Sequence, residues 1–195
     1  MKRVISALSL ALLAASASAF ELVVTPALPG TINPVAPFDV TIAGFTPANG
    51  VIGSLSVTDG PATVTYTYLG KEAGFSNGFF NLGGSTSAIA DSDAVGTSSQ
   101  QANVDGALSF SFNTFGVTTV SNGTASLPGA PTFAIFDGGN SPYDFIIAYG
   151  DGTGDQDFDD MVIGVTAAIP EPQTYALLLA GLGVVGFVAR RRRPV

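Results

Sequence analysis

The sequence predicts an all-β protein, an antiparallel β-sandwich or jelly roll, whose folded body covers residues 20–169. Short runs in which apolar and polar residues alternate recur along this body, as in strands with one buried face. Turn-forming Gly, Pro, Asn and Asp residues separate the runs, and no window of the body repeats apolar residues at the spacing of an amphipathic helix. Strands at such spacing, without helices between them, are typical of two packed antiparallel sheets.

Nine segments of the body are candidate strands because their residues alternate and end at turn signals. In one of them, Val64, Tyr66 and Tyr68 fall on a single face, which predicts that these three side chains enter the core. The candidates are Glu21–Thr25, Phe38–Ala43, Ile52–Thr58, Thr63–Leu69, Ala107–Asn113, Val117–Val120, Thr132–Phe136, Phe145–Tyr149 and Met161–Ala167.

Three stretches define the expected connections. Asp59-Gly60-Pro61 predicts a turn between two strands, and Asn122-Gly123 is the strongest two-residue hairpin signal in the chain. The Gly- and Ser-rich stretch Gly83–Gln101 interrupts the strand pattern. It is interpreted either as a long surface loop or as a loop holding a short helix around Ser85–Ala90.

The first 19 residues have the pattern of a secretory signal peptide. Met1-Lys2-Arg3 is the positively charged start, Val4–Ala15 is the apolar run, and Ala17-Ser18-Ala19 is a cleavage site bordered by small residues. The run is short for a membrane-spanning helix. We therefore expect export and a mature chain that begins at Phe20.

The body is strongly acidic and lacks two reactive residue types. Lys71 is its single basic residue against fourteen acidic ones, a formal net charge of −13. Nucleic-acid binding requires a basic surface and is excluded as a function class. The chain contains no Cys and no His. This excludes disulfides, cysteine nucleophiles, His-based catalytic triads and zinc sites built on His or Cys.

The C-terminal tail, residues 170–195, contains a second apolar run. Thr174–Ala189 comprises 16 uncharged residues, and as a helix it would extend ~24 Å, slightly less than the ~30 Å hydrocarbon core of a bilayer. Arg190, Arg191, Arg192 and Arg193 follow at once, and arginines beside a span favour the cytoplasmic side. The pattern predicts a transmembrane helix. A buried core helix or a nucleic-acid-binding tail would not explain arginines directly behind an apolar run.

This tail resembles the PEP-CTERM sorting signal. Three parts occur in the family's order: Ile169-Pro170-Glu171-Pro172, the apolar segment with Leu177–Gly183, and Arg190–Arg193. Ile169 stands where the family usually has Val. The resemblance implies processing by an exosortase, a membrane cysteine transpeptidase, in a Gram-negative bacterium that makes extracellular polysaccharide.

The resemblance also implies a route for the protein. The precursor would be anchored in the inner membrane, cleaved near Pro170, Glu171 and Pro172, and moved to the cell surface or extracellular matrix. Two prolines predict that the motif itself is extended.

The densest chemical feature is the acidic loop, residues 151–160, with Asp151, Asp155, Asp157, Asp159 and Asp160. Five carboxylates without a nearby cation in sequence repel one another. Calcium, which takes 6–8 oxygen ligands in flexible loops, is the one cofactor that the sequence suggests for them. The alternative is a solvated or self-capping acidic hairpin. Neither interpretation assigns a catalytic residue, and the spacing is not that of an EF-hand.

Two further observations concern the same loop. Asp155–Val162 resembles a pattern in an uncharacterised domain of bacterial surface proteins, in which the aspartates are thought to bind metal or to lock the loop. Lys71, the body's only cation, is expected to pair either with Glu72 or with the acidic loop.

Two functions fit these features. The first is a non-enzymatic surface or matrix protein associated with exopolysaccharide, in which calcium would either bridge the chain to anionic sugars or stiffen the acidic loop. The second is a secreted carbohydrate-binding module or carbohydrate-active enzyme. A sugar-binding cleft is usually lined by aromatic rings, but the chain has no Trp and most of its Phe residues alternate as core positions. The sequence favours the first function.

Overall fold

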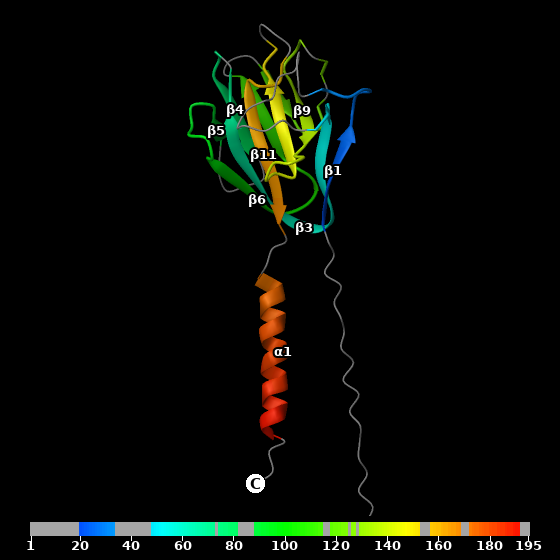
Figure 1. The fold of residues 1–195 in the computed structure, drawn as a ribbon, viewed down its shortest axis with the longest axis vertical. Helices are drawn as coiled ribbons and strands as arrows, with labels where there is room; N and C mark the ends of the chain where they lie inside the picture. The colour runs from blue at the N-terminus through cyan, green and yellow to red at the C-terminus, as the bar shows by residue number, and fades with distance from the viewer. Residues whose placement is uncertain are drawn as a thin grey trace, which may run out of the picture.

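The computed structural model describes residues 20–33, 48–72, 74–81, 88–114, 118–124, 126–127, 129–152, 157–168 and 172–191. These residues form strands joined into two antiparallel sheets and one C-terminal helix (Figure 1). The all-β class predicted for the body is confirmed. The elements are β1 (Glu21–Pro26), β2 (Gly50–Val51), β3 (Gly53–Gly70), β4 (Asn77–Asn81), β5 (Ala88–Ala90), β6 (Ser98–Ala107), β7 (Phe110–Thr114), β8 (Thr118–Ser121), β9 (Thr132–Asp137), β10 (Phe145–Gly150), β11 (Met161–Ala168) and α1 (Pro172–Arg191).

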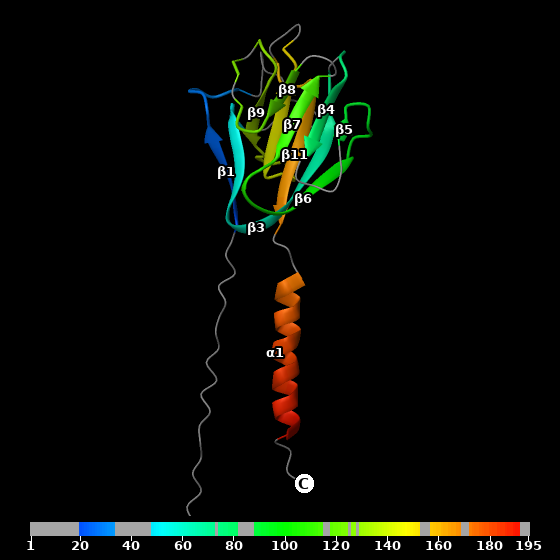
Figure 2. The same ribbon diagram turned by 180° about the vertical axis from the view of Figure 1, so that it is seen from behind.

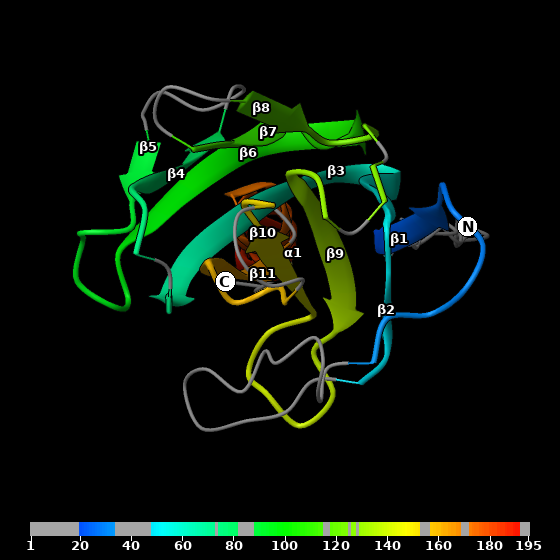
Figure 3. The same cartoon turned by 90° about the horizontal axis from the view of Figure 1, so that it is seen from above.

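The larger sheet is nearly closed on itself. Its strand order is β1-β3-β11-β10-β9-β2, with β6 paired to the other edge of β3. β2 pairs with β9, and after Ile52 the chain continues into β3, which pairs with β11. One continuous run of chain therefore contacts both sides of the β9-β10-β11 group, and Figure 3 shows β3 curving around it.

β3 is a single bent strand, although the sequence predicts two strands and a turn. The bend lies at Asp59 and Gly60, whose φ angles are 64° and 126°. Before the bend β3 pairs with β1, and after it with β11, while β6 follows the opposite edge past both halves. The turn signal at Asp59-Gly60-Pro61 is thus a bend within one strand. The prediction that Val64, Tyr66 and Tyr68 enter the core is confirmed.

The smaller sheet, in the order β5-β4-β7-β8, lies beside the larger one (Figures 1 and 2). Aromatic side chains of both sheets share one core cluster. Phe112 of β7 stacks on Tyr149 of β10, with ring centroids 4.8 Å apart and planes 5° from parallel. Phe79 of β4 lies against Tyr66 of β3 at 4.9 Å. Such ring pairs contribute more than their buried area alone, so they fix how the two sheets sit on each other.

Several sequence expectations about connections are wrong. Ala88–Ala90 is a strand rather than part of a helix, and Ser98–Gln101 begins β6 rather than ending a surface loop. The predicted strand Ala107–Asn113 is divided between the end of β6 and β7. Asn122-Gly123 follows β8 and does not connect two neighbouring strands. Phe38–Ala43 lies outside the described residues.

Helix α1 occupies the expected place behind the body, and Figure 1 shows it standing apart from the sheets. It begins at Pro172, a favoured first helical residue, so the expectation of an extended motif is wrong at this position. Leu177 and the other large apolar side chains described on α1 are exposed. Within the described part of the chain, no helix combines the length and apolar composition needed to cross a membrane. The predicted transmembrane helix therefore stays a prediction.

Candidate functional site

The acidic loop lies at the end of the body that is farther from α1. β10 enters this loop and β11 leaves it, and β11 then runs toward α1 (Figure 1). A strand of the length of β11 extends about 25 Å, which separates the loop from the sorting tail. We call the described residues Glu72, Asp151, Asp157, Asp159 and Asp160 the acidic end.

Lys71 neutralises a buried carboxylate beside the acidic end. Its Nζ lies 2.7 Å from Oδ2 of Asp91, a residue that follows β5 and is almost fully buried. The same oxygen accepts the backbone N–H of Asn77 at 2.8 Å, and the Asp91 carbonyl accepts the Tyr68 hydroxyl at 2.9 Å. The ion pair is therefore with Asp91, and the two predicted partners, Glu72 and the acidic loop, are wrong.

Glu72 and Asp159 join the end of β3 to the loop before β11. The backbone N–H of Glu72 donates to the carbonyl oxygen of Asp159 at 2.9 Å, and their side chains are also hydrogen-bonded. Asp159 is only 5% exposed. Burial raises its pKa to about 8, and the charge of Asp157, the bond to Glu72 and the charges of Glu72 and Asp160 add to the rise. The Asp159 carboxyl therefore holds a proton at neutral pH.

Asp151 and Asp160 close the same loop across its base. Oδ2 of Asp160 accepts the backbone N–H of Asp151 at 2.7 Å, and Asp151 is 2% exposed. This bond is the self-capping arrangement that the sequence left open as one alternative. Asp155 lies outside the described residues, and the described ones include no group of three or more acidic side chains placed to hold a metal ion. Calcium binding stays a prediction.

A buried polar chain connects the acidic end to the core between the sheets. The hydroxyls of Tyr149 and Thr114 lie 2.9 Å apart, and Thr114 Oγ1 donates to Oδ1 of Asn77 at 2.8 Å. Burial raises the pKa of Tyr149; its bond to Thr114 lowers that pKa, and the charges of Asp151 and Asp160 raise it. The Tyr149 side chain therefore stays a neutral hydroxyl that takes part in this hydrogen-bonded chain.

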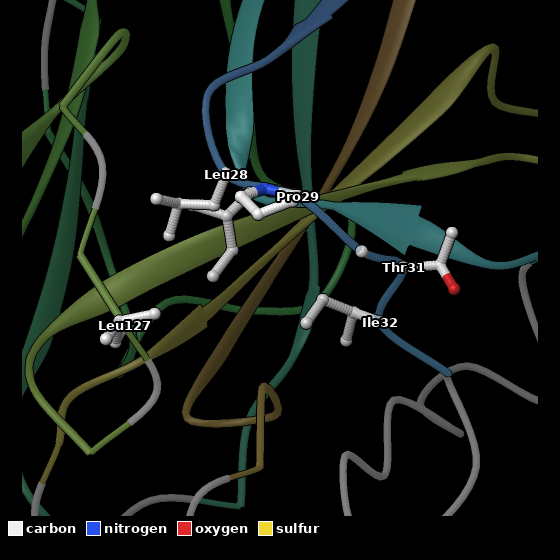
Figure 4. Close-up of a pocket in the computed structure, with 7 residues that line it drawn as sticks. Leu28, Pro29, Thr31, Ile32 and Leu127 are labelled. Atoms are coloured by element: carbon white, nitrogen blue, oxygen red, sulfur yellow. The ribbon is translucent and has the colours of Figure 1, made fainter.

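Two hollows elsewhere on the body do not include the acidic end. One, of about 90 Å³, lies between the segment after β1 and exposed Leu127, with Leu28 and Ile32 on its walls (Figure 4). The other, of about 390 Å³, lies where Phe20 and Asp144 come together near the start of β1. The first hollow is lined by no carboxylate. The second is lined by Glu21 and Asp144, and its two aromatic residues, Phe20 and Phe145, are partly buried against the core.

The predicted processing residues are described only in part. Pro172 begins α1, and Arg190 and Arg191 lie exposed in its last turn. The signal-cleavage residues and the rest of the sorting residues lie outside the described part of the chain. They are Ala17, Ala19, Pro170, Glu171, Arg192 and Arg193.

Comparison with known protein families identifies the tail. The family model of the PEP-CTERM protein-sorting motif matches residues 168–193 and confirms the resemblance of this segment. Neither a curated protein nor a solved structure matches the chain. The motif implies export, a membrane-anchored precursor and processing by an exosortase that delivers the protein to the surface. The chain therefore carries a PEP-CTERM protein-sorting motif behind an antiparallel β body.

Proposed function

We propose that this protein is a non-enzymatic component of the cell surface or extracellular matrix of a Gram-negative bacterium. The observation that supports this most is the course of β11, which connects the acidic end to the sorting tail. While the precursor is anchored, this arrangement holds the acidic end outward, away from the bilayer. The net charge of the body keeps it soluble among polysaccharide chains after release.

The proposed precursor is anchored by α1 and the residues beside it. The large apolar side chains described along α1 are exposed, which suits contact with lipid better than contact with water. Arg190 and Arg191 end the helix and would lie on the cytoplasmic side. Residues 1–19 would supply the export signal, and signal peptidase would cut after Ala19.

A non-enzymatic role is supported by where the aromatic rings lie. Tyr66, Phe79, Phe112 and Tyr149 pack on one another between the sheets and offer no face to a sugar. Among the described residues of the body, Phe75 is the aromatic side chain with high exposure. A carbohydrate-binding module or enzyme would need several exposed rings beside paired acids, so we place this alternative second.

The proposed ligand of the acidic end is calcium, with anionic exopolysaccharide as the partner it would bridge. Glu72, Asp157 and Asp160 surround Asp159 with negative charge, and that charge contributes to its raised pKa. A divalent cation would relieve the same repulsion that a proton now relieves. Asp155 would add a further carboxylate from the same loop.

The sorting proposal is tested by changing the motif in a host that has an exosortase. Deleting Pro170–Pro172 should leave the protein uncleaved and in the inner-membrane fraction, because the motif would then be missing. A matched control replaces Pro26 and Pro29 of the body with Ala and should still be sorted. Cell fractionation with an immunoblot separates the forms by size and location. Normal release of the deletion variant would contradict sorting through this motif.

The calcium proposal is tested on the full-length chain in mild detergent. Millimolar calcium should raise the melting temperature of the original protein, since an ion that binds only the folded state stabilises it. Asp157→Asn with Asp159→Asn should abolish that rise. Asp59→Asn is the matched control: it removes one charge at the bend of β3, away from the acidic end, and Asn tolerates the positive φ there. Calcium should still raise the melting temperature of this variant. An unchanged melt of the original protein would contradict calcium binding and leave sorting untouched.

A further inference from the structure

The side chain of Asn122 holds the two sheets together at one point. Its Oδ1 accepts the backbone N–H of Leu55 at 2.9 Å. Its Nδ2 donates to the carbonyl oxygen of Leu55 at 2.8 Å and to that of Leu108 at 2.7 Å. Leu55 lies in β3 of the larger sheet, and Leu108 precedes β7 of the smaller one. We call these three bonds the Asn122 clip.

The clip uses the full hydrogen-bonding capacity of the side-chain amide N–H groups. Two carbonyl oxygens can only accept and the Leu55 N–H can only donate, so the orientation of the amide is fixed by its partners. The backbone N–H of Asn122 is also held, by the carbonyl oxygen of Phe110 at 2.9 Å. Gly123, the next residue, is exposed and has a positive φ of 85°.

An Asn followed by Gly is chemically the least stable kind of asparagine, because glycine offers no side chain to obstruct its own nitrogen. The backbone nitrogen of Gly123 can attack Cγ of Asn122: a C–N bond forms, the Cγ–Nδ2 bond breaks, and ammonia leaves with the proton of the Gly123 N–H. Water then opens the resulting succinimide at either carbonyl. The products are aspartate or isoaspartate at position 122.

We propose that Asn122-Gly123 is a latent deamidation site, which the folded protein protects through the Asn122 clip. While the clip is closed, Cγ is turned toward β3 and both N–H groups of the leaving amide are bound to carbonyl oxygens. Attack requires that the amide leave all three partners. Conversion is therefore limited by opening of the end of β8 away from β3.

After conversion of Asn122, the folded protein cannot form the Asn122 clip again. In the product, a carboxylate oxygen replaces the Nδ2 donor and faces the carbonyl oxygens of Leu55 and Leu108, which are acceptors as well. The new carboxylate oxygen repels both carbonyl oxygens. The Leu55 carbonyl keeps the backbone N–H of Leu108 at 3.1 Å, whereas the Leu108 carbonyl loses the amide donor of residue 122, and a buried acceptor that loses a partner destabilises the folded state. A molecule that has opened and converted at position 122 therefore cannot re-form the clip.

The chain contains two other Asn-Gly pairs that serve as internal references. Asn49 is exposed, and its neighbour Gly50 is tied to the chain through the bridge to Ile32. Asn77 is fully buried, and Thr114 Oγ1 donates to its Oδ1. In the unfolded chain all three pairs are equivalent in their local chemistry. Differences between their native rates therefore report on the fold.

The test measures deamidation in the full-length chain in mild detergent, in mildly alkaline buffer with and without denaturant. Peptide mass spectrometry reads the gain of one mass unit at each Asn-Gly pair, and water labelled with heavy oxygen identifies hydrolysis during the incubation. We expect Asn122 to convert at least about tenfold more slowly in native buffer, because three hydrogen bonds of ordinary net strength must open together. Equal rates with and without denaturant would overturn the proposal.

Two matched variants separate opening of the clip from global unfolding. Val120→Ala removes a buried side chain of β8 beside the clip, and Val162→Ala makes the same change in β11. Val120→Ala should speed native conversion at Asn122 several-fold more than Val162→Ala does. Equal acceleration by both variants would show that only global unfolding exposes the site, and would overturn protection by the clip.

The irreversibility is tested with the product side chain itself. Asn122→Asp should lower the melting temperature clearly more than Asn49→Asp, because only the first places an acceptor against the carbonyl oxygens of Leu55 and Leu108. Asn122→Ala distinguishes repulsion from loss of bonds and should be destabilised less than Asn122→Asp. If Asn122→Asp and Asn122→Ala have the same melting temperature as Asn49→Asp, the clip does not hold the two sheets together.

Discussion

Lys71 Nζ lies 2.7 Å from Oδ2 of Asp91, and this pair joins the end of β3 to the end of β5, one in each sheet. Asp91 is nearly inaccessible to solvent, whereas Lys71 keeps part of its side chain in water. The pair is thus anchored on the buried side, where the carboxylate also accepts the Asn77 N–H. A body with a single cation uses it for an internal carboxylate instead of the acidic loop.

Replacing Lys71 should therefore destabilise the protein. Lys71→Met leaves the Asp91 carboxylate buried without its cation, and we expect the free energy of unfolding to fall by about 1.5–3 kcal/mol, the range for hydrogen bonds to charged groups. Denaturant unfolding measures the change. Lys71→Met combined with Asp91→Asn should lose less than the sum of the two single changes. Additive losses would mean that the pair contributes nothing as a pair.

The stability of the protein should fall as the pH rises from acid to weakly alkaline. The folded protein holds the Asp159 proton up to about pH 8, whereas the unfolded chain loses it near the ordinary value of 3.8. Between these values the folded state binds more protons than the unfolded one, so raising the pH favours unfolding. Below and above this window Asp159 has no effect on the pH dependence.

Asp159→Asn checks this sign. The amide stays neutral, so in chelator the variant should be more stable than the original protein at pH 8, by at least the ~1.4 kcal/mol that one pKa unit represents. At pH 4 the two should differ less. Denaturant unfolding at the two pH values measures both differences. An original protein that gains stability relative to Asp159→Asn as the pH rises would contradict the raised pKa.

The stacked rings of Phe112 and Tyr149 should carry a large share of the packing between the sheets. Phe112→Ala removes a fully buried ring and leaves a cavity against Tyr149, and we expect a loss of about 3–5 kcal/mol. Phe75→Ala, on a side chain that is 57% exposed, should change stability by less than about 0.5 kcal/mol. Thermal unfolding of both variants measures the difference between the two losses of stability. A small effect at Phe112 would mean that the sheets are held mainly elsewhere.

The strands that the sequence predicts correctly are those with local signals. β9, β10 and β11 combine alternating or continuous apolar residues with turn residues on both sides, and each was expected within a residue or two of its bounds. The sequence does not predict β6 as a strand, because its Ser- and Gln-rich residues have weak strand preference. It is a strand because it pairs with β3 along most of its length, which is a tertiary effect.

In the candidate site, too, the sequence predicts features that have a local signal and does not predict those that depend on contacts between distant residues. The acidic loop is visible in the sequence because its carboxylates are close together along the chain. Glu72 was not identified as a partner of Asp159, because only the pairing of β3 with β11 brings residues 87 positions apart into contact. Asn122-Gly123 predicts a hairpin turn, but in the structure the side-chain amide of Asn122 bonds to Leu55 of β3 and closes no hairpin.

A glycine in β11 should be as sensitive to change as a core side chain. The ring of Tyr143 lies over Gly164, and a Cβ built at this glycine would lie 2.5 Å from the ring, closer than atoms without a bond can approach. Gly164→Ala therefore requires the ring or the strand to move, and we expect a loss of about 1–3 kcal/mol, as for other overpacked sites. Gly74→Ala is the matched control, because a Cβ there meets nothing within 4 Å. Denaturant unfolding of the two variants measures the difference. If Gly164→Ala proves as mild as Gly74→Ala, Tyr143 can leave its place at little cost, and the packing of its ring on β11 is not part of what stabilises the larger sheet.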